Sequence, residues 1–97
     1  MKNNIPDRVM KDILTAAEYA AVNKVILFGS RARGTHRERS DIDLAVHGGD
    51  FNAFYWYMQE HAWTLLQFDI VELGACSNQE LLAEIGKEGV VLYEKAG

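Results

Sequence analysis

Apolar residues in the first third of the chain recur with the period of a helix and then form one continuous run. The pair Pro6-Asp7 is typical of a helix start, and the 3.6-residue period after it predicts a helix to about Val22. The apolar face of this helix comprises Val9, Ile13, Ala16, Ala17 and Ala20. The continuous run over residues 24–28 predicts a buried strand.

The pattern changes to strict alternation after a polar stretch. Residues 30–33 are compatible with one helical turn that Gly34 stops, and residues 35–40 are polar and typical of a loop. Residues 41–46 alternate, which predicts a half-buried strand. Its inward positions are Ile42, Leu44 and Val46.

The second half of the chain predicts two further helices and two further strands. Asp50 is a suitable N-cap for a helix. The apolar face of that helix comprises Phe51, Phe54, Tyr55, Met58 and Ala62. A third strand is predicted over residues 67–73, and a capping box at residues 77–80 opens a helix that closes near Gly86. A last short strand is predicted over residues 90–93.

This order of elements predicts an α/β (α+β) fold, in which helices back a single sheet of about four strands. The loop between the first two strands is too short for a crossover helix, so these strands are expected to be antiparallel. The sheet is therefore expected to be mixed.

The chain is 97 residues long and has no linker, repeat or low-complexity tract, which favours one domain over residues 1–97. Folding is expected to bury roughly 65% of the surface of the unfolded chain, enough for one core. A reaction that needs a second, substrate-binding domain would require that domain from another chain.

Charge is distributed unevenly along the chain. The formal net charge is −4, yet residues 30–40 contain four arginines and one glutamate and carry +3. The acidic balance argues against a general nucleic-acid binder, so no direct nucleic-acid contact is expected.

The sequence favours a soluble, cytoplasmic protein. Cys76 is the single cysteine, which excludes an intramolecular disulfide and a multi-cysteine zinc site. The first residues form no continuous apolar segment of the kind found in signal peptides. No apolar run approaches the ~20 residues of a membrane span, so no membrane contact is expected.

Three carboxylates stand out on the predicted strands. Asp41 and Asp43 are two residues apart, so both side chains project from the face opposite the predicted core. Asp69 has the same orientation on the third strand, between Phe68 and Ile70. If these strands are neighbours, the acids converge on a site for Mg²⁺, and two such ions would suit phosphoryl or nucleotidyl transfer.

The pair Gly29-Ser30 supplies a complementary feature between the first strand and the helical turn. Amides at the start of a helical turn bind anions, glycine allows close approach of a phosphate, and Arg31 and Arg33 add positive charge. The simpler alternative is that the acids form a solvated strand edge and that the Gly-Ser pair is coincidental. The combined spacing and strand context favour a triphosphate site.

Gly29-Ser30, a ten-residue gap and Asp41-Ile42-Asp43 together resemble the GS-x10-DxD signature of the nucleotidyltransferase superfamily that includes DNA polymerase β. The strings GSRARG, SDIDL, FDIVEL and EGVVLYE resemble the minimal nucleotidyltransferases (MNT) of bacteria and archaea over nearly the whole chain. The resemblance implies a nucleotidyltransferase palm, with Gly29 and Ser30 on the nucleotide phosphates, Asp41 and Asp43 on the metals, and Asp69 on the catalytic metal.

The implied reaction is the transfer of NMP, most often AMP from ATP, to a hydroxyl. The family also implies a partner, because minimal nucleotidyltransferases are commonly the antitoxins of helical HEPN toxins and can AMPylate a toxin tyrosine. The resemblance leaves open which NTP is used, which acceptor receives the nucleotide and how many nucleotides are transferred. It also leaves open whether the chain forms a homo-oligomer or a hetero-oligomer.

Two other interpretations remain open at this point. The chain could be a catalytically silent module that neutralises or scaffolds a partner, although the intact Asp41, Asp43 and Asp69 argue against it. It could also be a small α/β regulatory domain whose acids are only surface groups.

The aromatic residues, the histidines and two arginines have no assigned role in the predicted nucleotide site. Aromatic residues gather between Phe51 and Trp63, and most are expected in the core, with Trp56 or Trp63 at an interface and base stacking as a third option. The histidines His36, His47 and His61 are expected to be solvated, and the roles of Arg37 and Arg39 are open.

Overall fold

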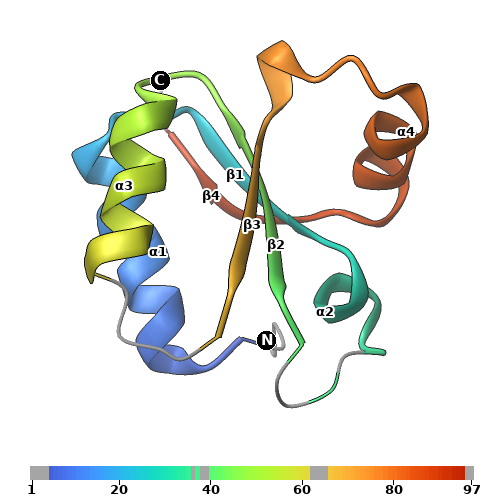
Figure 1. The fold of residues 1–97 in the computed structure, drawn as a ribbon, viewed down its shortest axis with the longest axis horizontal. Coiled ribbons are helices and arrows are strands. Elements are labelled where there is room, and N and C mark those ends of the chain that lie inside the picture. The colour runs from blue at the N-terminus through green and yellow to red at the C-terminus, as the bar shows by residue number, and fades with distance from the viewer. Residues whose placement is uncertain (1–4, 36, 38–39, 62–65, 96–97) are drawn as a thin grey trace.

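A computed structural model describes residues 5–35, 37, 40–61 and 66–95. Helices and strands interleave along the chain (Figure 1). Their order is α1 (Asp7–Tyr19), β1 (Lys24–Phe28), α2 (Ser30–Arg33), β2 (Ile42–His47), α3 (Phe51–His61), β3 (Phe68–Glu72), the 3-10 turn η1 (Leu73–Ala75), α4 (Gln79–Glu88) and β4 (Val90–Glu94).

The four strands form one mixed sheet in the order β3-β2-β1-β4. Strand β1 pairs antiparallel with both β2 and β4, whereas β2 and β3 run parallel. The predicted mixed sheet, the antiparallel pairing of the first two strands and the adjacency of β2 and β3 are all confirmed.

Helices cover both faces of the sheet (Figure 1). Helices α1 and α3 pack together on one face, and α2 and α4 lie on the other. The main core lies under α1 and α3 and includes the predicted inward positions of β2, which are fully buried. Its largest fully buried side chains are Phe54, Ile13, Leu27, Ile42, Leu44 and Met58.

The opposite face carries a second, smaller core, so the prediction that the core takes only one face was incomplete. Phe28, Ala45 and Ile85 are buried there. Ile85 comes from α4, which closes over part of the face that alternation alone leaves exposed. A sequence pattern shows that α4 has an apolar side, but it does not show which face of the sheet receives it.

Two helix ends differ from the predicted ones. Helix α1 ends at Tyr19 rather than near Val22, because the amides of Ala21 and Val22 bond back to the carbonyls of Glu18 and Ala17. This is a Schellman-type ending with Ala21 at φ +52°. Helix α4 continues to Glu88, past the expected end at residue 86.

The N-cap of α4 is Asn78 rather than the Ser77 implied by the capping box. The Oδ1 atom of Asn78 accepts a hydrogen bond of 3.1 Å from the amide of Leu81. We expect Asn78→Ala to lower the free energy of unfolding by about 1 kcal/mol and Ser77→Ala to leave it nearly unchanged. Urea unfolding of both variants measures the difference, and equal losses would contradict this assignment.

The cap of α3 is the predicted one, since Asp50 Oδ1 accepts a hydrogen bond of 3.1 Å from the amide of Ala53.

Among the described helices, none is long and apolar enough to cross a membrane.

Candidate active site

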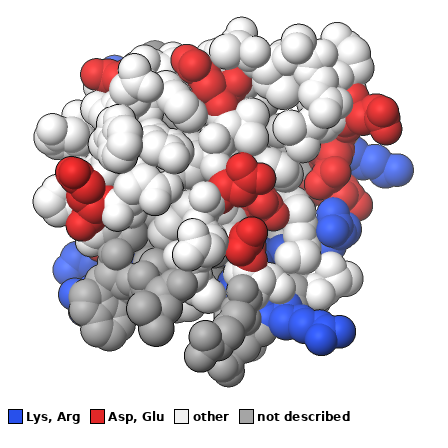
Figure 2. Space-filling view, viewed as in Figure 1, with Lys and Arg blue, Asp and Glu red and all other residues white. Residues whose placement is uncertain are grey.

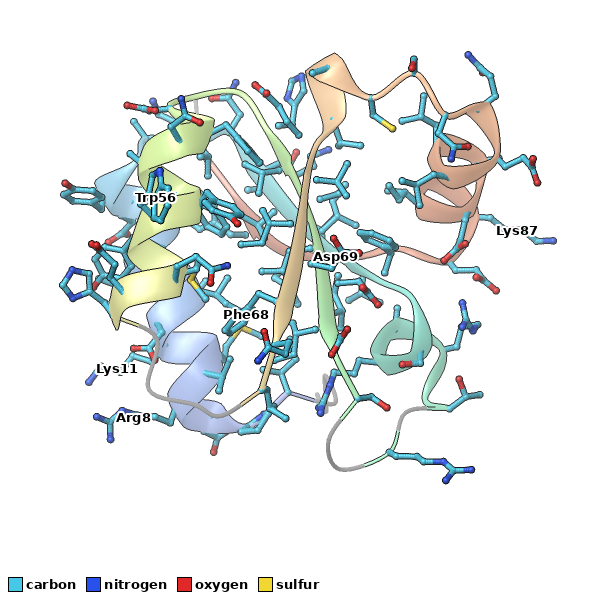
Figure 3. The ribbon with its side chains drawn as sticks, in the orientation of Figure 1. Arg8, Lys11, Trp56, Phe68, Asp69 and Lys87 are labelled. Atoms are coloured by element: carbon cyan, nitrogen blue, oxygen red, sulfur yellow. The ribbon has the colours of Figure 1, made fainter. Side chains whose placement is uncertain are left out.

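Three aspartates gather on the sheet face that is shared with α2 and α4. Asp43 of β2 and Asp69 of β3 are direct neighbours in the parallel register. Asp41, directly before β2, is close enough to disfavour the charge of Asp43. Figure 3 shows Asp69 on the side of β3 toward α2 and α4, while Phe68 points toward α1 and α3. The structure thus brings together the three acids that the sequence places on one face.

Asp43 is the half-buried member of the three, and its environment disfavours its charge. Burial, followed by repulsion from Asp69, Asp41 and Glu84, raises the pKa of Asp43 from 3.8 to about 6, against a lowering effect of Arg33. The burial has a visible source, because Asp43 pairs across the sheet with Phe28 and lies two residues from Ala45, both in the smaller core. A cation at this face would relieve the repulsion.

The raised pKa gives a testable pH dependence of stability. The folded chain binds the Asp43 proton more tightly than the unfolded chain, so this carboxylate destabilises the fold above pH 6 and the penalty disappears between about pH 6 and 4. We expect Asp43→Asn to be more stable than the wild type at pH 7.5 without metal, by about 1 kcal/mol or less after solvent screening.

Thermal unfolding of both proteins at pH 7.5 and pH 5 measures this effect. The advantage of Asp43→Asn should shrink at the lower pH, because the wild-type carboxyl is then mostly protonated. A difference in Tm that does not change with pH would show that the charge on Asp43 carries no such penalty.

Gly29 joins β1 to α2 directly beside Asp43. Its φ of +75° lies in the region that favours glycine, and a Cβ at this position would collide with the Asp43 carboxylate and lie 3.0 Å from its Cγ. The chain therefore passes so close to Asp43 that only glycine fits. Ser30 follows as the first residue of α2, where the amides lack intrahelical acceptors. The predicted Gly29-Ser30 turn and the acids are thus neighbours in space.

Arg31 faces inward rather than toward the open side of the site. It is 3% exposed, and its Nε and Nη2 atoms donate hydrogen bonds of 3.2 and 3.1 Å to the carbonyl of Ser40. Ser40 directly precedes Asp41, so Arg31 ties α2 to the start of the acidic strand. These contacts give Arg31 a positioning role, while its contact with a nucleotide stays a prediction.

Arg33 lies at the exposed edge of the site, against α4. Its Nη1 atom is 3.3 Å from Glu88 Oε1 and 3.5 Å from Glu84 Oε2. Glu84 also raises the pKa of Asp43, so α4 contributes acidic groups to the electrostatics of this face. Neither glutamate was predicted from the sequence, although their spacing of four residues on one helix indicates that they share a side.

The acids do not form a ready-made metal cage. In the part of the chain that the structure describes, no three His, Cys, Asp or Glu side chains are grouped to hold one ion. The donor set nevertheless fits Mg²⁺, which binds one or two carboxylates and completes its shell with water and substrate phosphates. The adjacent side chains of Asp43 and Asp69 offer such a pair of carboxylates. A triphosphate beside Gly29 would supply further oxygen ligands to the ion.

The space-filling view shows the same arrangement of charge. Figure 2 shows carboxylates in the middle of the visible face of the molecule, with basic groups beside them on the side of α2 and α4. In the basic loop, the amide of Arg37 donates a hydrogen bond of 2.8 Å to Ser40 Oγ, whereas His36 and Arg39 lie outside the described residues.

Comparisons with known proteins identify the family of this fold. The model of the family described as "Polymerase beta, Nucleotidyltransferase" matches residues 11–96. A comparison with curated proteins finds no match.

Solved structures provide more detail. A toxin–antitoxin crystal structure with AMP-PNP contains a chain that is 27% identical, with a TM-score of 0.72, covering 89% of this chain and 73% of that one. A mutant of the toxin–antitoxin pair MntA-HpeT contains a chain that is 25% identical, with a TM-score of 0.70 and the same two coverages, 89% and 73%. The family match over residues 11–96 includes the strands and turns that form the acidic face.

Proposed function

The chain belongs to the polymerase β nucleotidyltransferase family, and on that premise we propose that it transfers AMP from ATP to a hydroxyl of a partner protein with the help of Mg²⁺. The observation that carries the proposal is the placement of Asp43 between Gly29 and Asp69 on one sheet face. A phosphate site and adjacent oxygen ligands are the two parts that a nucleotidyl transfer needs.

Each residue has a role in this proposal. The amides of Gly29 and Ser30 hold the triphosphate, Arg33 adds positive charge at its edge, and Asp41, Asp43 and Asp69 are the metal ligands. Mg²⁺, when bound, would neutralise the phosphate charge and polarise the reacting phosphorus. Arg31 keeps the Ser40–Asp41 segment in place.

The chemical change is a single exchange of bonds. The acceptor oxygen bonds to the α-phosphorus of ATP, the bond from that phosphorus to the bridging oxygen breaks, and pyrophosphate leaves with the electron pair. The hydroxyl proton passes to a base, for which Asp69 is the proposed group because it is exposed on β3, an edge strand of the sheet. Atoms and charge balance with no further reactant.

The proposed acceptor is a tyrosine of a helical HEPN-type toxin, which would make this chain a protein adenylyltransferase antitoxin. Two similar structures are toxin–antitoxin complexes, and one of them contains AMP-PNP. These features support, for this chain, a toxin partner and an adenine nucleotide.

The test uses the full chain with α-labelled ATP, Mg²⁺ and the protein encoded beside its gene. We expect label on the partner, none when its acceptor tyrosine is replaced by phenylalanine, and none when EDTA removes the metal. Transfer with ATP well above transfer with GTP, CTP or UTP would identify the nucleotide. Absence of label on every acceptor tried, with partner binding intact, would contradict the proposal.

That contradicting outcome would favour a second candidate, a catalytically silent module that binds and neutralises its partner. The absence of a three-ligand group among the described side chains is the observation in its favour. The two candidates differ in one measurement, because only an enzyme loses neutralisation when ATP is omitted.

A further inference from the structure

A groove of about 400 Å³ lies on the other side of the sheet, between α1 and α3. Tyr19, Trp56 and Tyr57 line it, together with His61 and the carboxylates of Asp50 and Glu60. Figure 3 places Trp56 on α3, across the sheet from the face that holds Asp69. The groove is therefore separate from the candidate active site.

Tyr57 packs against the main core, but Tyr19 and Trp56 are not needed to fill it. Helix α3 buries Phe54 and Met58 completely, as predicted, whereas Trp56 is 58% exposed and Tyr19 is 69% exposed. Trp63 and Ala62 lie outside the described residues. Large apolar side chains left in solvent beside a groove are typical of a binding surface.

Ring contacts hold these exposed side chains in place. Trp56 meets Tyr55 edge-on with ring centroids 5.3 Å apart, and Tyr57 lies between Tyr19 at 5.4 Å and His61 at 4.7 Å. A surface whose rings are already ordered loses little side-chain entropy when it binds.

The charge of the groove selects the kind of guest. Asp50 and Glu60 are its carboxylates, and the faces of Trp and Tyr rings are themselves electron-rich. A guanidinium or ammonium group is attracted to both features, and Arg stacks on such rings. A nucleotide would bring its phosphates against the two carboxylates, which argues against base stacking here.

We propose that the α1–α3 groove binds an arginine or lysine side chain carried by a partner protein. The cation lies against Trp56 and Tyr19 and is neutralised by Glu60. This docking surface would hold a partner on one side of the molecule while the acidic face stays open to ATP. The proposal concerns binding only, and it does not require that the chain catalyse any transfer.

The test follows the indole proton signal of Trp56 by NMR during titration with N-acetyl-arginine amide. The uncharged N-acetyl-citrulline amide, which has nearly the same shape, is the matched ligand. Loss of the signal in Trp56→Phe assigns it. We expect a saturable shift with the arginine ligand and binding at least about fivefold weaker with citrulline, as for a cation–π contact of about 1 kcal/mol.

Variants locate the site. Binding to the variants is followed by the backbone amide signals of α3, which every variant keeps. Trp56→Ala and Glu60→Gln should each weaken arginine binding severalfold, while Val91→Ala, at an exposed apolar position on β4, should leave it unchanged. Equal binding of both ligands, or arginine-induced shifts confined to Asp41, Asp43 and Asp69, would overturn the proposal. Dimerisation in sedimentation velocity that Trp56→Ala abolishes would overturn it in favour of a second copy of this chain.

Discussion

Asp43→Asn abolishes nucleotide transfer, with a loss of at least about 10³-fold in kcat/KM, or about 4 kcal/mol of transition-state stabilisation. Asparagine has the same shape but carries no charge, so the adjacent Asp69 is left alone to hold a metal. The same change removes a carboxylate that is disfavoured in its charged form by burial and by the neighbouring acids. The variant should therefore fold at least as stably as the wild type while losing activity.

A matched control separates this effect from a general loss of negative charge. Glu72 is an exposed carboxylate on the same strand as Asp69, and Glu72→Gln should keep both activity and stability. The measurement is the steady-state rate of label transfer from ATP, together with Tm. Activity of Asp43→Asn within tenfold of the wild type would exclude Asp43 from the reaction.

Gly29→Ala impairs both stability and activity. A residue with a Cβ at φ +75° is strained by about 1–3 kcal/mol, and this Cβ would also displace the Asp43 carboxylate. Misplacing a reacting group by about 1 Å can lower the rate by about 10²-fold. We expect Tm to fall by about 4–8 °C for each kcal/mol of stability that is lost in a chain of this size. The transfer rate should be at least about 10²-fold lower.

Gly74 provides the control for this substitution. A Cβ added there meets nothing within 4 Å, so Gly74→Ala should leave Tm and the transfer rate nearly unchanged. Thermal unfolding and the labelled-ATP assay measure both variants. If Gly29→Ala retains full activity, the chain need not approach Asp43 as closely as the structure places it.

The hydrophobic pattern was sufficient to predict most elements, because each depends on neighbouring residues. Strand β1 and the turn α2 occupy the predicted residues, since an apolar run and two glycines define them locally. The burial of Ile85 against Ala45 was not predictable, because a pattern does not show which face of a sheet a distant helix covers. The 3-10 turn at Leu73–Ala75 had no local signal that we used.

The candidate site also has features that the sequence pattern predicts and features that depend on the tertiary structure. Alternation is enough to predict that Asp41 and Asp43 share a face, and the structure places Asp41 close enough to disfavour the charge of Asp43. The contribution of Glu84 depends on where α4 packs, which only the tertiary structure defines. Arg31 and Arg33 looked equivalent in the sequence, but residues two apart on a helix point to different sides, and one is buried while the other is paired with α4.

The most direct test of the account is the location of the metal–nucleotide site. AMP-PNP with Mn²⁺ in place of Mg²⁺ broadens NMR signals close to the ion, and no acceptor is needed for the measurement. We predict that broadening centres on Gly29, Ser30, Asp41, Asp43 and Asp69, spares the groove at Trp56, and disappears in Asp43→Asn. Broadening centred on any other face of the molecule, or unchanged in Asp43→Asn, would contradict it.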